Sequence, residues 1–517
     1  MTQERLPELR PENISEAELL RRRVEAIAEI AQEQGLAPFP VNFEIVPAAI
    51  MYEFGSYGIP GRYSHWTHGK AYHQVKTMYD YGLSKIYELV VNNNPAWAFL
   101  LENNGVLQNT LVAAHVVAHV DFFKNNPAFK DTNRQMINGA SLNSERVRRY
   151  ELEHGSLEVE RFLDDVLAIE ANIDPAELKR PSPEQYVAQA GEEFKRRQRQ
   201  RRREATDYDD LLELGQPKKD KPGETKAPVP LDEEQDLLYF IRARSPKPLE
   251  PWQEDIIDIV RVEGQYFLPQ ARTKIMNEGW AVYWHVRILR EMEEKGLLLP
   301  GEEIAWREMH AGVASPGRNR INPYYIGWKV FEDITRRYEG RAHPDGKKQK
   351  TWWGEEIDPQ ATKGKPEYNV FWVREMVSSD QAFLAEYLTL GLIKELDLYV
   401  YEYTPQTREW KITEKDPQKV KDRLVRSMTN FGLPVIKVAP GGEDYNGNRE
   451  LYLVHKIDAD DEGGQKELDI PWAERTLASI HRLWGRPVHL ETVIGGERIL
   501  LSYTGEEKGH TRTKLTA

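Results

Sequence analysis

The sequence predicts a mostly α-helical N-terminal region followed by a C-terminal α+β domain, which has an antiparallel sheet and ββα-type repeats. Two observations predict this arrangement. Long stretches before about residue 390 repeat apolar residues at helical spacing. From Asp397 onward, short segments instead alternate apolar and polar residues, in pairs separated by helical segments. Because 517 residues leave room for several cores, the change of pattern indicates separate domains.

Four parts are expected along the chain. Residues 1–185 form a helical first part of the core. Residues 186–232 form a charged linker or insertion, because GQPKKDKPGETKAPVP at 215–230 has almost nothing to bury. Residues 233–390 form a helical second part of the core, and residues 391–517 form the α+β module.

Helices are expected in order along the N-terminal region. Residues 15–34 have the pattern of a capped amphipathic helix, because Ser15 is positioned to cap it and Glu18 follows three residues later. Gly35 ends this helix. Further helical segments are expected at 76–91, 141–170 and 182–205.

Three hairpins are expected in the C-terminal module, with helical segments between them. They pair LDLYVYEYT with REWKITE, PVIKVAP with RELYLVHKI, and RPVHLETVI with ERILLSYT. The histidines of this module, His455, His481 and His489, are scattered singly and are expected to be structural. We therefore expect a binding or assembly module rather than a catalytic one.

Composition excludes several kinds of site. The chain has no cysteine, so any metal must bind His, Asp or Glu. A net charge of -13 argues against general nucleic-acid binding. The basic run KRRQRQRRR at 195–203 is either a solvated helix or a docking surface for an acidic partner, nucleic acid or a membrane. With no signal peptide and no run of about 18 apolar residues, we expect a cytoplasmic protein without a transmembrane segment.

The segment LVAAHVVAHVDFFKNN at 111–126 contains the first candidate site. In a helix, His115 and His119 lie on one face and can approach one metal ion. Buried imidazoles are costly without polar partners, so this pair is either two metal ligands or a hydrogen-bonded pair in the core. The spacing alone leaves both interpretations open.

A second segment, NEGWAVYWH at 277–285, resembles the third-ligand helix of gluzincin metallopeptidases. In that pattern the Glu completes a zinc site begun by two histidines four residues apart. The resemblance implies zincin-like metal-site helices, with Glu278 as the third ligand beside His115 and His119. His285 is then a fourth ligand or a group behind the ligands. A divalent metal, with zinc as the first choice, is the implied cofactor.

The sequence departs from the gluzincin pattern at one catalytic position. In H-E-x-x-H enzymes the Glu after the first His is the general base, and here that position is Val116. Either another carboxylate replaces it, with Asp121, Glu151 and Glu308 as candidates, or the site is not a peptidase. A di-metal bundle site is the rival interpretation, because ELEH pairs Glu151 with His154, but such sites normally use two copies.

Two polar and aromatic segments, IPGRYSHWTHGKAYHQ at 59–74 and HAGVASPGRNRINPYYIGWKVFEDI at 310–334, are expected to form loops beside the same site. Their Arg, Asn, His and Tyr side chains suit ligands with carboxylate or sugar-like groups. The alternative is that these side chains fix irregular backbone by hydrogen bonds. The candidate substrate-binding residues are His65, His68, Arg318, Arg320, Asn322 and Tyr324.

Six segments of the chain are long and have an unusual sequence. They are GIPGRYSHWTHGKAY at 58–72, YGLSKIYELVVNNNPAWAFLLE at 81–102, HVVAHVDFFKNN at 115–126, TKIMNEGWAVYWH at 273–285, ASPGRNRINPYYIGWKVFEDI at 314–334 and REMVSSDQAFLAEYLT at 374–389. Together they resemble the SpoVR family, the bacterial stage V sporulation protein R proteins.

The resemblance implies a cytoplasmic protein that acts in sporulation, at formation of the spore cortex, a modified peptidoglycan layer. It implies no established reaction, so two functions stay open. One is a metal-dependent hydrolase in which Arg318 or Arg320 binds an anionic group of the substrate. The other is a scaffold or regulator of cell-envelope enzymes that keeps a metal for stability. Other sporulation or cell-envelope proteins are the implied partners.

Overall fold

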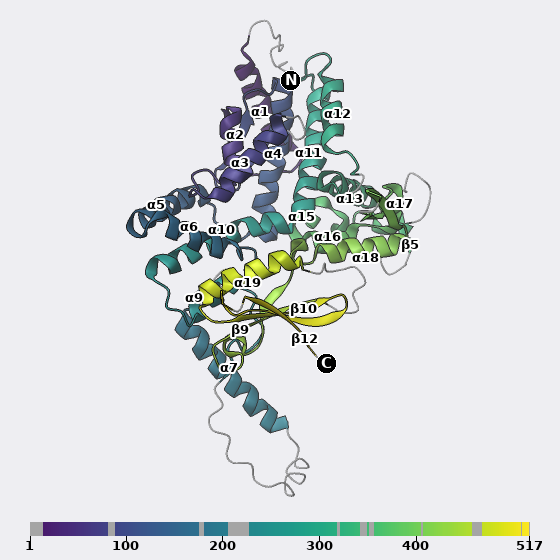
Figure 1. Cartoon of the computed structure of the whole chain (residues 1–517). Helices are drawn as coiled ribbons and strands as arrows, with labels where there is room; N and C mark the ends of the chain where they lie inside the picture. Colours follow the sequence, from purple (N-terminus) through teal and green to yellow (C-terminus); the bar gives the residue numbers. More distant parts are fainter. Residues whose placement is uncertain are drawn as a thin grey trace, which may run out of the picture. The chain divides into compact units, whose positions relative to one another are not determined.

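In the computed structural model, the chain divides into two compact units, each made from two separate stretches (Figure 1). The first unit comprises Met1–Arg148 and Tyr266–Phe431, and the second comprises Arg149–Gln265 and Gly432–Ala517. The four-part division expected from the sequence stays a prediction. The structure describes residues 14–80, 88–174, 180–204, 227–317, 321–341, 349–350, 356–404, 407–457, 468–507 and 509–515.

The first unit is built mainly from helices around one small three-stranded sheet. Its N-terminal stretch contains α1 (Glu16–Glu33), β1 (Val41–Val46), α2 (Ala48–Tyr57), α3 (Trp66–Asp80), β2 (Leu89–Val91), β3 (Ala96–Leu101), α4 (Val106–Asn125) and the start of α5 (Met136–His154). Its second stretch contains the end of α10 (Pro251–Arg272), α11 (Lys274–Glu294), α12 (Glu302–Val313), α13 (Pro323–Tyr338), β4 (Gln349–Lys350), β5 (Glu356–Ile357), α14 (Pro359–Thr362), α15 (Val370–Met376), α16 (Asp380–Tyr387), α17 (Leu390–Glu395), β6 (Val400–Thr404), β7 (Glu409–Glu414) and α18 (Pro417–Ser427).

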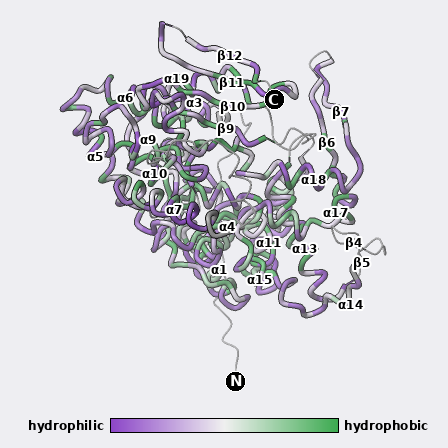
Figure 2. The backbone as a smooth tube through the Cα atoms, turned by 90° about the horizontal axis from the view of Figure 1, so that it is seen from below, coloured by the Kyte–Doolittle hydropathy of each residue, from purple (hydrophilic) through white to green (hydrophobic). Residues whose placement is uncertain are grey.

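The second unit combines helices with a five-stranded sheet. Its elements are the rest of α5 and α10, α6 (Ser156–Leu167), α7 (Pro183–Glu204), α9 (Leu237–Arg244), β8 (Ile436–Val438), β9 (Leu451–His455), α19 (Ile470–Trp484), β10 (Val488–Ile494), β11 (Glu497–Tyr503) and β12 (His510–Lys514). The hydrophilic residues of α7 are coloured purple in Figure 2.

Helix α4 is the central helix of the first unit and is apolar on nearly all sides, as a helix enclosed by protein must be. Its face with Val112, Val116 and Val120 packs against Ala98 and other residues of β3. The opposite face, with Ala113 and Val117 among others, joins the core formed with α1 and α11. In the part of the chain that the structure describes, α4 alone is long and apolar enough to cross a membrane, and it is mostly buried in the protein.

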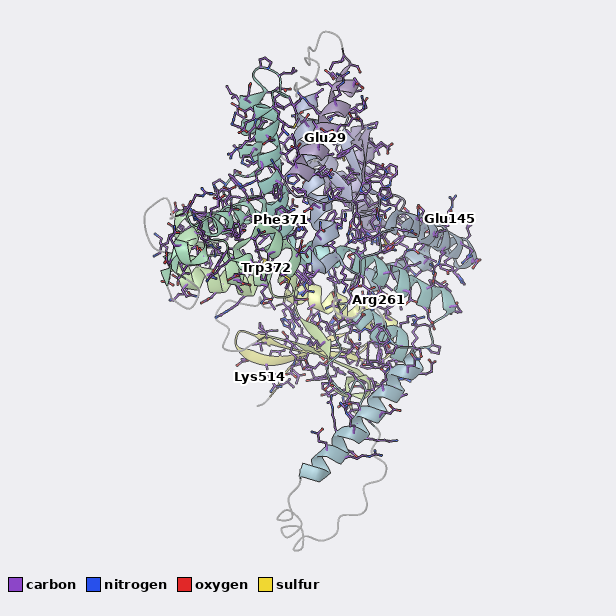
Figure 3. All side chains as sticks on the ribbon, turned by 180° about the vertical axis from the view of Figure 1, so that it is seen from behind. Glu29, Glu145, Arg261, Phe371, Trp372 and Lys514 are labelled. Atoms are coloured by element: carbon purple, nitrogen blue, oxygen red, sulfur yellow. The ribbon has the colours of Figure 1, made fainter. Side chains whose placement is uncertain are left out.

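Helices α11 and α13 approach each other closely through two glycines. A Cβ on Gly279 would lie 2.4 Å from the Cα of Gly327, and a Cβ on Gly327 would lie 2.1 Å from the carbonyl oxygen of Ile275. Only glycine therefore permits this crossing. Beside it, Phe371 of α15, labelled in Figure 3, contacts the rings of Trp280 and Trp284 on α11.

Several predicted helices are confirmed. The helix expected over 15–34 is α1, and Ser15 caps it by accepting a hydrogen bond from the backbone N–H of Glu18 at 3.2 Å. The helix expected over 182–205 is α7. The segment 141–170 is helical, but it forms α5 and α6, because Gly155 interrupts it with a positive φ of 94°.

Other expectations for the N-terminal region are wrong. The helix predicted over 76–91 does not reach its end, because residues 89–91 form β2 and pair with β3. The loop predicted over 59–74 is largely helix α3, which contains His68. The segment 310–334 includes the end of α12 and the start of α13, with a loop between them. Most of the predicted linker at 215–230 lies outside the described residues.

The C-terminal sheet and the three predicted antiparallel hairpins, β6–β7, β8–β9 and β10–β11, are confirmed, but the prediction that one wholly antiparallel sheet joins them is wrong. The strand order is β12-β11-β10-β9-β8, and β9 pairs with β10 in parallel. A parallel pair needs a crossover, and α19 provides it between these two strands. The first predicted hairpin, β6 and β7, forms a separate two-stranded ribbon in the first unit.

Candidate metal centre

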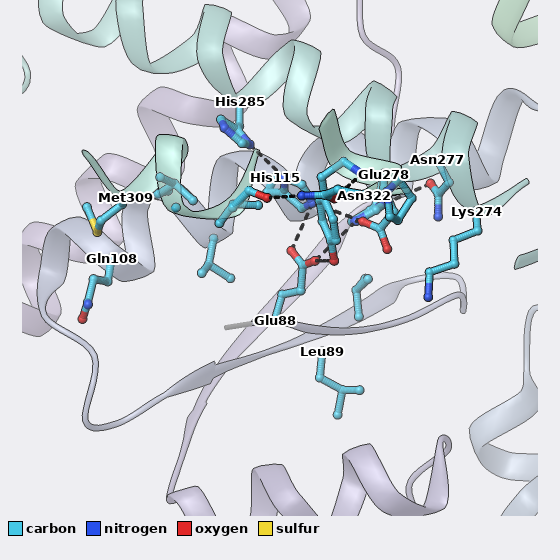
Figure 4. A pocket seen from close by; sticks show the side chains of 18 of the residues that line it. Glu88, Leu89, Gln108, His115, Lys274, Asn277, Glu278, His285, Met309 and Asn322 are labelled. Atoms are coloured by element: carbon cyan, nitrogen blue, oxygen red, sulfur yellow. Dashed lines mark hydrogen bonds and ion pairs between the residues drawn. The ribbon is translucent and has the colours of Figure 1, made fainter. Parts of the chain in front are cut away.

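Helix α4 presents two buried histidines, His115 and His119, one turn apart. Val116 takes the neighbouring face of the helix and packs on the sheet, which explains why no carboxylate follows the first histidine. Glu278 of α11 reaches both imidazoles. Its Oε2 lies 3.7 Å from Nε2 of His115 and 3.4 Å from Nε2 of His119 (Figure 4). The structure thus brings together the three residues that the sequence predicts as ligands.

A fourth group, Glu88, is missing from the residues predicted from the sequence. Its Oε2 lies 3.3 Å from Nε2 of His115, and its Oε1 lies 3.8 Å from Nε2 of His119. The sequence prediction missed Glu88 because it placed this residue in a helix over 76–91. In the structure, Glu88 lies directly before the short strand β2. A carboxylate immediately before the apolar run Leu-Val-Val was the signal that could have indicated a buried acid.

Donor atoms of Glu88, His115, His119 and Glu278 all lie within 4.8 Å of one another, and this buried cluster could hold a metal ion. The four ion-pair distances of 3.3 to 3.8 Å are close to the separation of about 3.3 Å between ligands placed about 2.05 Å from a tetrahedral zinc.

Two buried atoms of the cluster point to the same conclusion. Nε2 of His115 and Oε2 of Glu278 make no hydrogen bond within the described part of the chain. Buried polar atoms are normally hydrogen-bonded or bound to an ion. The donor set therefore fits a divalent metal.

The other nitrogen of each histidine is held from behind. Nδ1 of His119 lies 2.9 Å from Oδ1 of Asn277, an acceptor, so Nδ1 carries a proton and Nε2 is the nitrogen that faces the cluster. Nδ1 of His115 lies 2.8 Å from Nδ1 of His285. His285 in turn contacts Nδ1 of His310 through its Nε2, at 3.0 Å. His285 thus lies behind His115 and outside the group of four donors.

The start of α11, which carries Asn277 and Glu278, is fixed by a buried carboxylate. Asp380 of α16 accepts hydrogen bonds from the backbone N–H groups of Ile275 at 2.8 Å and Met276 at 2.9 Å. These N–H groups belong to the first turn of α11, where no helical carbonyl is available to them. Asp380 therefore helps to set the position of the α11 side chains in the cluster.

Burial and the neighbouring charges shift the pKa values of the cluster residues in opposite directions. Burial raises the pKa of Glu88, but the positive charges of His115 and His119 outweigh burial and hold this pKa well below its usual range. Burial also raises the pKa of Glu278, and the same histidines lower it overall. Burial lowers the pKa of each histidine, yet the two carboxylates raise the pKa of His115 and bring that of His119 to about 10. Without metal, these shifts favour two imidazolium groups that are balanced by two carboxylates.

The cluster opens into a cavity of about 1410 Å³ in the first unit (Figure 4). Of the predicted substrate-binding residues, Asn322 and Tyr324 line it. Tyr324 donates a long hydrogen bond of 3.4 Å to Oε1 of Glu88, and burial, followed by the charge of Glu88, raises the pKa of Tyr324. The amide of Asn322 caps α13 and donates to the backbone oxygens of Val313 and Ser315. Arg318 and Arg320 lie outside the described residues.

His65 and His68 are buried but do not line this cavity. The ring of His65 contacts Thr67, and His68 packs against the rings of Tyr57 and Tyr63. Burial lowers the pKa of His68 to about 4. The structure therefore does not bring these histidines together with the metal cluster.

The candidate proton acceptors also differ in their positions. Asp121 is fully engaged elsewhere, because it accepts hydrogen bonds from Arg374 at 2.7 Å and from the indole N–H of Trp280 at 3.0 Å. Glu151 belongs to the second unit. Glu308 lines the cavity, although it is outside the cluster.

Comparisons with known proteins cover almost the whole chain. Residues 15–433 match the family described as SpoVR like protein, and residues 434–495 match the SpoVR-like C-terminal domain. A relative from Escherichia coli (strain K12), named Uncharacterized protein YcgB, is 29% identical over 486 residues, which are 90% of each chain. No solved structure matches at a significant level. The chain therefore belongs to the SpoVR family.

Proposed function

We propose that the protein binds one divalent metal ion, with zinc as the first choice, through His115, His119 and Glu278, in a zincin-like site. The single observation that carries this proposal is the convergence of four donor atoms in a buried cluster, two of which make no hydrogen bond. Imidazole and carboxylate donors suit zinc in four-coordinate sites. Glu88 is the further carboxylate of the cluster, either as a fourth ligand or as a catalytic group.

The reaction that this site supports best is metal-dependent hydrolysis. When bound, the metal supplies a Lewis acid that polarises the bond to be cleaved. Glu88 is the proton acceptor, since its carboxylate lies beside both histidines, 3.3 Å from Nε2 of His115 and 3.8 Å from Nε2 of His119. In H-E-x-x-H enzymes the Glu after the first His is the proton acceptor. This chain has Val116 at that position, and Glu88 takes the role instead. Tyr324 donates to Glu88 and orients it.

Membership of the SpoVR family suggests a sporulation-related role. We propose that the hydrolysis acts in formation of the spore cortex, from the cytoplasm, on a peptidoglycan precursor. The large cavity beside the cluster supports a substrate of more than a few atoms.

A scaffold or regulator of cell-envelope enzymes is the second candidate function. The observation that favours it is the charge balance of the metal-free cluster, in which two carboxylates already compensate two imidazolium groups. A protein of this kind would keep the cluster for stability alone.

Variants of the cluster separate the two functions. Zinc-loaded protein is incubated with purified peptidoglycan precursors, and new amine or carboxyl ends are measured by liquid chromatography and mass spectrometry. Glu88→Gln should keep the metal and lose about 10²- to 10⁴-fold in rate, the usual effect of removing a general base. His119→Ala should lose both metal and activity.

Glu308→Gln is the matched control, because Glu308 lines the same cavity outside the cluster and should leave the rate unchanged within a few fold. Product formation that is equal in wild type, Glu88→Gln and His119→Ala would contradict the hydrolase and favour the scaffold.

A further inference from the structure

We propose that a tyrosine-lined cleft beside the metal cavity binds an apolar or aromatic side chain of an extended peptide substrate. This inference rests on the metal-dependent hydrolysis of the proposed function, and it names an extended peptide rather than a peptidoglycan precursor as the substrate. It is carried by three observations in the first unit, which are the lining of the cleft, its shared wall with the metal cavity, and the free edge of strand β2.

The cleft has a volume of about 200 Å³ and lies between the start of α13, the region before β6, and α18. Three tyrosines, Tyr325, Tyr399 and Tyr401, line it together with aliphatic side chains that include Leu398 and Leu424. An apolar cavity of about 150 Å³ is enough to bind benzene. The cleft therefore has room for one aromatic or large aliphatic side chain.

The charged, amide and serine side chains around the cleft are already engaged within the protein. Asp397 accepts a hydrogen bond of 2.7 Å from the hydroxyl of Tyr399, and Arg423 contacts Glu402 at 3.3 Å. Ser427 donates to the backbone oxygen of Leu424 at 2.7 Å. Asn322 donates to two backbone oxygens. A ligand with many hydroxyl groups would find few free partners here, so an apolar group fits better than a sugar.

The cleft lies next to the metal cavity. Gly317, Ile321 and Asn322 line both, so these residues form a common wall between the two spaces. A substrate held at the metal cluster needs only to pass this wall to reach the tyrosines. The cleft is therefore placed to recognise a group close to the bond that the metal site acts on.

Strand β2 offers a surface for the backbone of such a substrate. Among the described residues, β2 pairs with β3 on one side and with no strand on the other. Leu89 and Val90 of β2 line the metal cavity, and Glu88 directly precedes them. An exposed strand edge recognises extended peptides through main-chain hydrogen bonds, while pockets for side chains give specificity.

Peptide hydroxamates test this inference, because a hydroxamate binds zinc and the attached peptide reports on its surroundings. The zinc-loaded full chain is titrated by isothermal titration calorimetry with acetohydroxamate, with N-acetyl-Ala-Ala-Ala hydroxamate and with its three single Phe variants. At one of the three positions, Phe should bind at least about tenfold tighter than Ala, as burial of a large apolar group in a fitted pocket predicts.

Two variants, one directly before strand β6 and one in it, locate the effect. Tyr399→Ala should remove the gain from Phe and leave acetohydroxamate binding unchanged, because Tyr399 lines the cleft and not the metal cavity. Tyr403→Ala is the matched control, since Tyr403 is 48% exposed on β6 and does not line the cleft. It should keep the gain.

The outcomes separate this inference from the proposed function. Absence of zinc-dependent acetohydroxamate binding would contradict the metal site and the inference together. Zinc-dependent binding with no gain from Phe at any position would contradict the cleft alone. Tighter binding of an N-acetylglucosamine-linked hydroxamate than of every Phe peptide would also overturn the peptide assignment. The comparison of probes on the wild type decides the matter even where Tyr399→Ala fails to fold.

Discussion

At the scale of single residues, the metal cluster is held together by a balance of charge that a metal ion would change. The pKa of His119, about 10, means that this residue is an imidazolium at pH 7 in the metal-free protein, and the pKa of His115 is raised in the same direction. A metal ligand must be a neutral imidazole, so the metal replaces these protons. The carboxylates of Glu88 and Glu278 stay ionised in both states.

Zinc binding at pH 7 should therefore release at least about one proton per metal, the one that His119 loses, with a further contribution from His115. Apparent zinc affinity should rise with pH until the pH passes about 10, the pKa of His119 in the metal-free cluster. Calorimetric titrations in buffers of different ionisation enthalpy measure the number released. Glu308→Gln should release the same number, and release of less than half a proton in the wild type would contradict the charged state of the cluster.

Asn277 and His285 act on the ligands from behind. Because each contacts Nδ1 of one ligating histidine, removal of either should weaken zinc affinity by about 10- to 100-fold without abolishing binding. Competition with a chromophoric chelator measures the dissociation constants of Asn277→Ala and His285→Ala. Met309→Leu, a change in the wall of the same cavity, should leave affinity unchanged. Equal affinities in all three variants would show that the contacts behind the ligands do not tune the metal.

The sequence predicted part of this site for a physical reason. His115 and His119 are four residues apart on a continuous helix, and Glu278 belongs to a recognisable string, so local pattern was sufficient for these three residues. Glu88 comes from a segment with no periodicity of its own, and its role depends on a strand that pairs across the chain. The hydrogen bonds of Asp121 likewise depend on a distant partner, Arg374.

At the scale of helices and strands, the position of Glu278 depends on how closely α11 approaches α13. Gly279 and Gly327 meet at the crossing. Glu278, the proposed metal ligand, directly precedes Gly279. Any added side-chain atom at the crossing must separate the two helices. The same separation would move Glu278 relative to the histidines of α4.

Gly327→Ala should therefore lower the free energy of unfolding by about 1 to 3 kcal/mol, the usual cost of overpacking a core, and should weaken zinc binding as well. Chemical denaturation and the chelator competition measure the two effects. Gly191→Ala is the matched control, because Gly191 lies in helix α7 with no atom within 4 Å of an added Cβ. It should be neutral or stabilise by up to about 1 kcal/mol. An unchanged Gly327→Ala protein would contradict the close helix crossing.

Element prediction was most successful where one face or cap defined the helix, as in α1 with its Ser15 cap. It failed for β2 because Leu-Val-Val continues a helical pattern, and only pairing with β3 makes it a strand. For the C-terminal sheet it found the three hairpins, whose strands are neighbours in the sequence, but not how the hairpins associate with one another. The parallel pairing of β9 with β10 follows from the crossover through α19, which no local pattern specifies.

At the scale of the whole molecule, all four donors of the cluster belong to the first of the two units. A ligand that binds only the folded form stabilises it by about 2.7 kcal/mol when present at 100 times its dissociation constant. Metal should therefore stabilise the first unit directly and the second unit only through any coupling between them.

Removal of zinc with a chelator should increase amide hydrogen exchange in α4 and α11 more than in the second unit's strands β9 to β11. Mass spectrometry of peptides from the exchanged protein measures this difference. His119→Ala provides the control, because its exchange should already resemble that of the chelated wild type. An equal change in both units would contradict a stabilising effect confined to the first unit.

The division into two units could be predicted only in part from the sequence. A change of pattern at Asp397 indicated the start of a strand-rich region, and the five-stranded sheet confirms strands near the C-terminus. Each unit, however, combines stretches that lie more than 100 residues apart in the chain. Such combinations depend on long-range packing, which composition and local periodicity do not report.

The metal content of the purified protein tests the central claim most directly. Elemental mass spectrometry is applied to wild type, His119→Ala and Glu278→Gln after expression with added zinc, manganese or iron. The account predicts close to one metal ion per wild-type chain and a large loss in both variants, since each removes a donor of the four-residue cluster. A folded wild type that retains no metal under any of these conditions would contradict the claim and make His115 and His119 part of a charge-balanced core.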